Sequence, residues 1–244
     1  MTTLPFFYDN MMSNMPKGVL FAMEASILYE DNHLLFVEKP INVPVQEDNS
    51  KDQDLLSYLK EDLKIRYQKP GNVYLGLVHR LDRPVGGVMV FAKTSKAASR
   101  LSDTIRRNAM GKKYLAVVRG CPKKNKATLE DYLVKDRRKN QVYIAKADTK
   151  SAKKAVLDYE VIKEKDGLSL LSINLQTGRP HQIRVQLASR SHPLYGDQKY
   201  GSNVNKTGQQ IALWSYRLKL EHPTKKEEIT VTSNPPGKYP WNLW

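Results

Sequence analysis

Short segments rich in β-branched and aromatic residues recur along this chain, and turn-forming residues join many of them at close range. Two such segments around a tight turn predict an antiparallel hairpin. Residues 128–147 form the longest such pattern, with charged residues 136–140 at its turn. The other β-rich segments are 26–30, 34–39, 88–92, 113–119, 156–164, 168–176, 210–220 and 228–232. We predict an α+β fold, in which helices and loops flank a long mixed and mostly antiparallel sheet.

Two stretches have helical periodicity instead. In residues 52–68 one stripe of the predicted helix is apolar and consists of Leu55, Leu59 and Leu63. This spacing predicts an amphipathic helix that packs on the sheet. We expect Ser95 to cap a second helix through Asn108, because a serine side chain at this position accepts a backbone N–H.

A third helix is predicted after residues 177–180, because Pro180 suits the first helical position. Ile183 and Leu187 then keep one face apolar. Arg184 lies one residue round from Ile183, so we expect its stem to pack on the core face and its head to leave that face.

The length of 244 residues suits one domain with a sizeable core. We assign residues 25–244 to this domain and residues 1–24, which have no sustained periodicity, to a loosely ordered tail. Met1 and Met23 both fit as a natural start. No run approaches the roughly 18 apolar residues of a spanning helix. The single Cys121 excludes an internal disulfide framework and leads us to expect a cytoplasmic protein.

Positive charge dominates the composition. The chain has 40 Lys and Arg against 25 Asp and Glu, a formal net charge of +15. An excess of this size is typical of proteins that bind a phosphate backbone. It is concentrated in two stretches, which contain Lys96, Arg100, Arg106, Arg107, Lys112 and Lys113, and Lys123, Lys124, Lys126, Arg137, Arg138 and Lys139.

An acid between two arginines stands in a loop between two probable strands. Asp82 follows the mostly apolar run 74–81, and the strand 88–92 begins after Gly86 and Gly87. Loops on a rigid sheet commonly carry chemistry. An acid in this setting is either a turn residue or a chemical one.

Several signatures of metal and cofactor sites are absent from the sequence. One Cys and five dispersed His do not supply a clustered zinc site. There is no phosphate-binding G-x-x-x-x-G-K-[ST] loop, no G-x-G-x-x-G after a strand and no G-x-S-x-G elbow. We expect neither a metal nor a cofactor.

Four blocks stand in order along the chain and together are specific. They are His79-Arg80-Leu81-Asp82 with Gly87, Lys113-Tyr114-Leu115-Ala116, Leu175-Gln176-Thr177-Gly178-Arg179-Pro180-His181-Gln182-Ile183-Arg184, and His192-Pro193-Leu194-Tyr195-Gly196-Asp197 with Tyr200-Gly201. In these residues the chain resembles the RluA-type pseudouridine synthases. The resemblance implies that specific uridines of ribosomal RNA or tRNA are isomerised to pseudouridine, without metal or cofactor, on that family's catalytic fold.

The sequence departs from the family in one visible place. The family often has Thr-Ser-Gly where this chain has Val85-Gly86-Gly87, so two hydroxyl groups are lost beside Asp82. Many relatives also carry an N-terminal S4-like RNA-binding domain. The short stretch before Ala25 leads us to expect a member without that domain.

By resemblance, Asp82 is the essential aspartate. It acts either as a nucleophile at the sugar, or by stabilising positive charge there and assisting proton removal. Arg184 is the partner that keeps the carboxylate ionised and oriented. Tyr114 matches the active-site tyrosine, whose ring can stack on uracil and whose hydroxyl can serve in proton transfer.

The resemblance also implies residues that bind the substrate. Arg80 is expected to fill the space of a flipped nucleotide or to hold that nucleotide, and Leu81 and Ile183 to contact the substrate as well. His181 is expected to be structural. Asp197 is expected to organise its loop.

One alternative function stays open. A catalytically idle RNA-binding or ribosome-assembly protein could have the same fold, and Asp82 would then be dispensable. Asp82, Tyr114 and Arg184 together favour the enzyme, because backbone binding needs only basic charge. We expect a monomer with RNA as its partner.

RNA binding is expected to weaken steeply between low and moderate salt, because Lys and Arg that contact phosphates release counterions. Fluorescence anisotropy with labelled RNA over a salt series measures this slope. A flat response would contradict phosphate binding by the two basic stretches.

Overall fold

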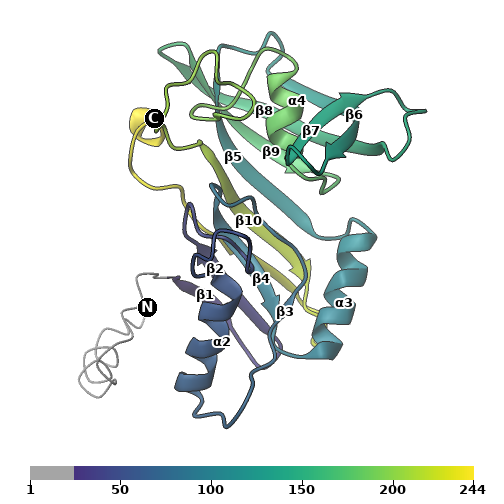
Figure 1. Ribbon diagram of the computed structural model, residues 1–244, viewed down its shortest axis with the longest axis vertical. Coiled ribbons are helices and arrows are strands. Elements are labelled where there is room, and N and C mark those ends of the chain that lie inside the picture. Colours follow the sequence, from purple (N-terminus) through teal and green to yellow (C-terminus); the bar gives the residue numbers. More distant parts are fainter. Residues whose placement is uncertain (1–24) are drawn as a thin grey trace.

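The computed structural model describes residues 25–244, and the predicted tail, residues 1–24, lies outside the described residues. Within the described range one 11-stranded sheet has the order β1-β2-β4-β10-β5-β9-β8-β6-β7, with β11 on β10 and β3 on β4 (Figure 1). All pairings are antiparallel except β10 with β4. The predicted α+β fold with a long mixed sheet is confirmed. The strands are β1 (Ile27–Glu30), β2 (Leu34–Lys39), β3 (Gly76–Leu77), β4 (Gly86–Ala92), β5 (Gly111–Arg119), β6 (Lys126–Asp136), β7 (Gln141–Ala145), β8 (Lys153–Lys165), β9 (Leu168–Leu175), β10 (Leu213–Glu221) and β11 (Glu228–Thr232).

The predicted hairpins are confirmed, and local side chains stabilise their turns. Between β1 and β2, Asp31 Oδ1 accepts the backbone N–H groups of His33 and Leu34, both at 2.8 Å. Between β6 and β7, Asp136 Oδ1 accepts those of Arg138 at 2.8 Å and Lys139 at 3.1 Å. Short acidic side chains favour such turns because they replace water as the acceptor.

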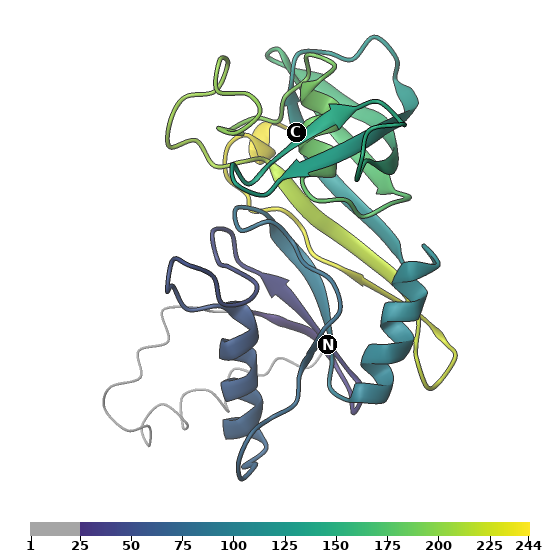
Figure 2. The ribbon, with the colours of Figure 1, turned by 45° about the vertical axis from the view of Figure 1, so that its right-hand side comes forward.

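The helices α2 (Leu55–Arg66) and α3 (Ser95–Arg106) cover opposite faces of the sheet (Figures 1 and 2). The predicted apolar stripe of α2 is confirmed, because Leu55, Leu59 and Leu63 are buried. The predicted cap of α3 is wrong by one residue. Thr94 is extended and its hydroxyl accepts the N–H of Ala97 at 3.2 Å, so Ser95 is already the first helical residue.

The predicted start of the third helix is also wrong. The helix α4 (Gln182–Ala188) begins two residues after Pro180, and His181 between them has a left-handed backbone with φ 50°. The side chain of Gln182 explains the late start. Its Oε1 accepts the Arg179 N–H at 3.0 Å and the Thr177 hydroxyl at 2.9 Å, which holds the preceding residues in a loop.

The apolar run 74–81 forms a shorter strand than predicted. Only Gly76 and Leu77 pair with β4, opposite Ala92 and Phe91. The neighbouring part of the same β4 edge is occupied by β10, which pairs in parallel with Gly86 and Gly87. The rest of the run is therefore a loop, and Asp82, which follows it, lies in the same loop, in agreement with the prediction.

Alternation along the strands separates two cores. On β4, Met89 and Phe91 pack into the core under α2 and α4, whereas Val88 and Val90 pack under α3. Tyr114 of β5 belongs to the first of these cores. The site therefore lies on the sheet face that α2 and α4 cover. No helix among residues 25–244 is both long and apolar enough to cross a membrane.

Substitution Gly87→Ala is expected to lower the free energy of unfolding by about 3 kcal/mol or more. Gly87 has φ 109°, and an added Cβ would lie 2.3 Å from the Ser215 carbonyl oxygen of β10. Gly71→Ala is the matched control, because Gly71 has φ 79° but nothing within 4 Å of an added Cβ. Urea denaturation of both variants measures the difference, and equal losses would contradict a steric role for Gly87.

Candidate active site

The buried ammonium group of Lys39 holds the loop that carries Asp82. Lys39, at the end of β2, is fully buried. Its Nζ donates to the carbonyl oxygens of Pro40, Arg83 and Val85 at 2.8, 2.9 and 2.8 Å. Burial lowers the pKa of this group, whereas the nearby Asp82 carboxylate acts to raise it. Two of the three acceptors belong to the Asp82 loop, so Lys39 fixes its backbone.

Arg184 contacts two carboxylates at once. Its Nη1 donates to Asp82 Oδ2 at 3.0 Å, and its Nε and Nη2 donate to the two oxygens of Asp197, both at 2.8 Å. Burial acts to lower the pKa of this guanidinium, but Asp197 and Asp82 outweigh burial and raise it. The predicted pairing of Arg184 with Asp82 is therefore present. The head of Arg184 pairs with these two carboxylates and stays buried, because α4 is buried from Gln182 to Leu187.

Asp197 organises its own loop, in line with the prediction. Its Oδ1 accepts the N–H groups of Lys199 at 2.9 Å and Tyr200 at 3.2 Å. The side chain is fully buried and uses both oxygens on Arg184 as well. This second role escaped the sequence reasoning, although a buried acid needs a cationic partner.

Tyr114, which is on β5, lies beside Asp82. Burial, and secondarily the negative charge of Asp82, raise the pKa of its phenol, while Ser215 opposes the shift. The phenol is thus protonated at neutral pH. Its ring belongs to the core that Ile183 and Leu213 share.

All six predicted site residues line one cavity of about 70 Å³. The structure thus brings together Asp82 and Arg184, which are 102 residues apart in the sequence. Arg80 is exposed and is the only one of the six that is not at least partly buried. The complete lining is Arg80, Leu81, Asp82, Val85, Tyr114, Leu175, Arg179, His181, Gln182, Ile183, Arg184 and Leu213.

His181 also lines this cavity, and Tyr200 orients its ring. The Tyr200 hydroxyl accepts the Val142 N–H at 2.8 Å and lies 2.7 Å from His181 Nδ1. Because the hydroxyl proton is then available for Nδ1, we assign the ring proton of neutral His181 to Nε2, 4.0 Å from Asp82 Oδ2. Burial lowers the pKa of His181 despite the charge of Asp82, so the neutral ring dominates at pH 7.

Two residues of the site had weak signals in the sequence. Lys39 continues the alternation of Leu35 and Val37, so a lysine stands on a core face of β2. Tyr200 was part of a motif, but its contacts with Val142 and His181 depend on the tertiary fold. Among residues 25–244, no three His, Cys, Asp or Glu side chains gather as a metal site.

Comparison with known proteins identifies the family. A family model described as RNA pseudouridylate synthase matches residues 33–189, which include Asp82, Tyr114 and Arg184. The chain belongs to this family. Its fold resembles human RNA pseudouridylate synthase domain containing 4, with TM-score 0.73, 22% identity, and coverage of 86% of this chain and 88% of that chain. Human RNA pseudouridylate synthase domain containing 1 has TM-score 0.71 and 24% identity, covering 91% and 87%.

Curated relatives are more similar in sequence. The ribosomal large subunit pseudouridine synthase C of Buchnera aphidicola subsp. Baizongia pistaciae is 33% identical over 219 residues, which cover 85% of this chain and 66% of that protein. An uncharacterized RNA pseudouridine synthase of Bacillus subtilis, YhcT, is 32% identical over 211 residues, covering 85% and 68%. This family member thus spans about two thirds of the length of these relatives.

Substitution Asp197→Asn is expected to lower the free energy of unfolding by about 3–5 kcal/mol, because it leaves the buried Arg184 with one carboxylate. Asp148→Asn is the control, since Asp148 is exposed, and should change stability by less than about 0.5 kcal/mol. Urea denaturation at neutral pH measures both. Equal stability of the two variants would contradict the role of Asp197 as the holder of Arg184.

Proposed function

We propose that this chain is an isomerase that converts specific uridines of ribosomal RNA or tRNA to pseudouridine, with Asp82 as its essential residue. The observation that carries the proposal is the Asp82–Arg184 ion pair inside a cavity that Tyr114 also lines. Family membership supports the same activity. Names of relatives that mention the ribosomal large subunit favour ribosomal RNA over tRNA.

The reaction needs no group from outside the RNA. The N1–C1′ bond of uridine breaks, the uracil turns, and C5 bonds to C1′ before the C5 proton leaves. Asp82 either attacks C1′ as a nucleophile or stabilises positive charge there and assists proton removal. Arg184 holds Asp82 Oδ2, and Oδ1 has no hydrogen-bond partner among residues 25–244. One carboxylate oxygen is therefore available for the sugar.

Tyr114 and His181 supply polar groups in the cavity that contains Asp82. The protonated phenol of Tyr114 offers a ring for stacking and a proton for transfer. His181, through Nε2–H, is a donor that faces the same cavity. Neither group needs to change its charge state on binding a neutral uracil.

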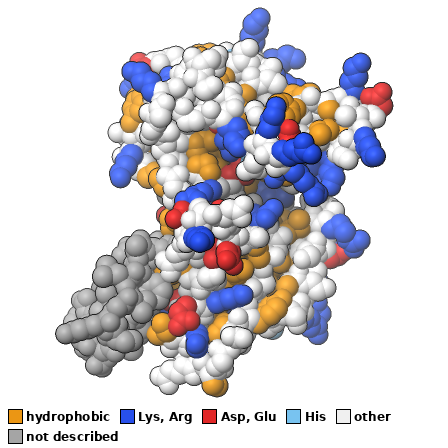
Figure 3. Space-filling view, viewed as in Figure 1, with side chains coloured by type: hydrophobic (Ala, Val, Ile, Leu, Met, Phe, Trp, Pro, Cys, Tyr) orange, Lys and Arg blue, Asp and Glu red, His pale blue; other side chains and the backbone are white. Residues whose placement is uncertain are grey.

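The target uridine must leave its stack to reach Asp82. Arg80 is exposed at the cavity, so its guanidinium can fill the vacated position or hold the flipped nucleotide. Leu81 and Ile183 offer apolar contact to the base. Figure 3 shows Lys and Arg side chains gathered near α3 and the β6–β7 hairpin, a surface suited to the phosphates on either side.

We further propose that residues 25–244 act as one catalytic unit, as a monomer, in the cytoplasm. The continuous sheet from β1 to β7 supports a single unit. The free and exposed Cys121 suits a reducing compartment. Light scattering of the purified chain tests the monomer.

Tritium release from RNA labelled at uracil C5 tests the activity. We expect release by the wild type without added metal or nucleotide, and a loss of at least about a thousandfold in Asp82→Asn, with RNA affinity unchanged. The control is Asp148→Asn, which makes the same charge change at an exposed position and should retain turnover.

Two outcomes would contradict the proposal at different levels. Near-normal turnover by Asp82→Asn would refute the role of this aspartate. Absence of release from the wild type, with RNA binding intact, would favour the alternative of an idle RNA-binding or ribosome-assembly protein on the same fold.

A further inference from the structure

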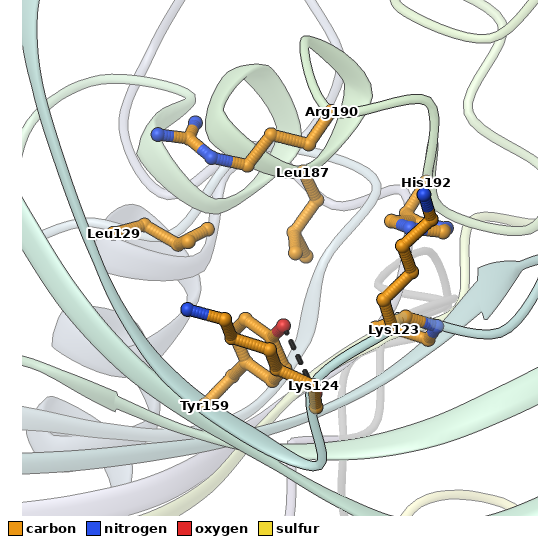
Figure 4. A pocket seen from close by; sticks show the side chains of 8 residues that line it. Lys123, Lys124, Leu129, Tyr159, Leu187, Arg190 and His192 are labelled. Atoms are coloured by element: carbon orange, nitrogen blue, oxygen red, sulfur yellow. Dashed lines mark hydrogen bonds between the residues drawn. The ribbon is translucent and has the colours of Figure 1, made fainter.

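A second, larger cavity of about 250 Å³ lies near the C-terminal end of α4 (Figure 4). The two cavities have no lining residue in common. Nothing in the chemistry derived above uses the larger cavity. It is lined by Pro122, Lys123, Lys124, Leu129, Tyr159, Leu187, Arg190 and His192.

The helix α4 connects this cavity to the active site. Ile183 and Arg184 line the active-site cavity, and Leu187, one turn later, lines the larger one. One turn corresponds to a rise of about 5.4 Å along the axis. The two cavities are therefore adjacent along α4, within the span of one RNA chain.

The inner wall of the larger cavity is apolar and includes a fixed aromatic ring. Leu129 of β6 and Leu187 of α4 are buried, and Tyr159 of β8 is half-buried. The Tyr159 hydroxyl donates to the Lys124 carbonyl oxygen at 3.2 Å, which holds the ring in place. A held aromatic ring is a stacking platform for a nucleobase.

The rim of the cavity is cationic. Lys123 and Lys124 are exposed, and neither ammonium forms an ion pair with any carboxylate in the described part of the chain. Arg190 is held by Asp131, with contacts at 2.9 and 3.2 Å, so its guanidinium is fixed at the opposite side. Lys123 and Lys124 are thus free to bind an anion.

His192 adds one directional group to this rim. Its Nδ1 lies 3.2 Å from the Arg119 carbonyl oxygen, which can only accept a hydrogen bond. The proton of the neutral ring is therefore on Nδ1, and Nε2 is left as an acceptor. Such an acceptor suits an N–H group of a base.

We propose that this cavity binds a second nucleotide of the RNA substrate, a few positions away from the target uridine. The base stacks on Tyr159 and its phosphate contacts Lys123 and Lys124. The inference rests on the proposed function, because that function makes RNA the ligand. A volume of 250 Å³ is below the usual range for drug-sized ligands and suits one nucleobase with part of its sugar. An acidic peptide would need the lysines but not an aromatic wall.

Charge reversal at the rim tests the phosphate contacts. We expect the double variant Lys123→Glu/Lys124→Glu to bind fluorescein-labelled oligouridine at least about tenfold more weakly than the wild type at fixed salt. Lys60→Glu/Lys64→Glu is the matched control, because it makes the same charge change on α2 in the other half of the molecule (Figure 1). The control should weaken binding by no more than about twofold. Equal weakening in both variants would mean that only net charge matters and would overturn the inference.

Substitution of the ring tests stacking independently of charge. Tyr159→Leu is expected to weaken oligouridine binding about tenfold, whereas Tyr159→Phe retains the ring and should bind more tightly than Tyr159→Leu. Photo-crosslinking with 4-thiouridine in the oligouridine should label the peptide that contains Tyr159. Binding and crosslinking of Tyr159→Leu at wild-type levels would overturn the inference. If circular dichroism shows that this variant does not fold, the Lys123→Glu/Lys124→Glu variant and the crosslink to the wild type decide whether the cavity binds RNA.

The same variants separate this inference from the proposed function. Tritium release by the wild type, with an unchanged KM in Tyr159→Leu and in the Lys123→Glu/Lys124→Glu variant, would overturn the second site and leave the isomerase intact. A crosslink at Tyr159 without tritium release would support the second site and contradict the isomerase. Binding of polyglutamate that depends on Lys123 and Lys124, without a crosslink to oligouridine, would overturn the inference in favour of an acidic protein segment.

Discussion

The site depends on the hydrogen bonds by which the guanidinium of Arg184 holds both Asp197 and Asp82. It joins α4 to the β3–β4 loop, which carries Asp82, and to the loop between α4 and β10, which carries Asp197. No hairpin connects these three parts of the chain. One cation faces two carboxylates, so the cluster keeps a net negative charge among many cationic neighbours. Because two of the three donating nitrogens are used on Asp197, the third has little freedom in where it places Asp82.

Local chemistry was sufficient to predict most of the fold. Asp31 and Asp136 form turns through contacts within three residues, and the leucine stripe of α2 depends only on helical spacing. The start of α4 could not be predicted in this way. Pro180 is compatible with a helix, but the side chain of Gln182 binds the backbone that precedes it, and this contact competes with helical structure. The shortness of β3 has a similar cause, because β10 comes from the other end of the chain to occupy the edge of β4.

For the site, the sequence yielded the residues that the motifs contain, and the structure yielded those that hold them. Asp82, Tyr114 and Arg184 were predicted from a resemblance, and they line one cavity. Lys39, as the support of the Asp82 loop, was missed, since its three acceptors are recognisable only when β2 and the loop are seen together. For Asp197, the sequence predicted that it organises its loop but not that it binds Arg184. The general reason is that a turn is a local property, whereas an ion pair between distant segments depends on the whole fold.

The departure at Val85-Gly86-Gly87 has a consequence for how this family member varies. An added Cβ at Gly86 would lie 2.3 Å from the ring of Trp214, and that ring is fixed by hydrogen bonds from its Nε1 to Ser233 at 3.0 and 3.1 Å. A serine at position 86 is therefore compatible only with a smaller or differently placed side chain at position 214. Gly86 and Trp214 are thus sterically coupled, because position 86 gains a side chain only where position 214 gives up or moves its ring.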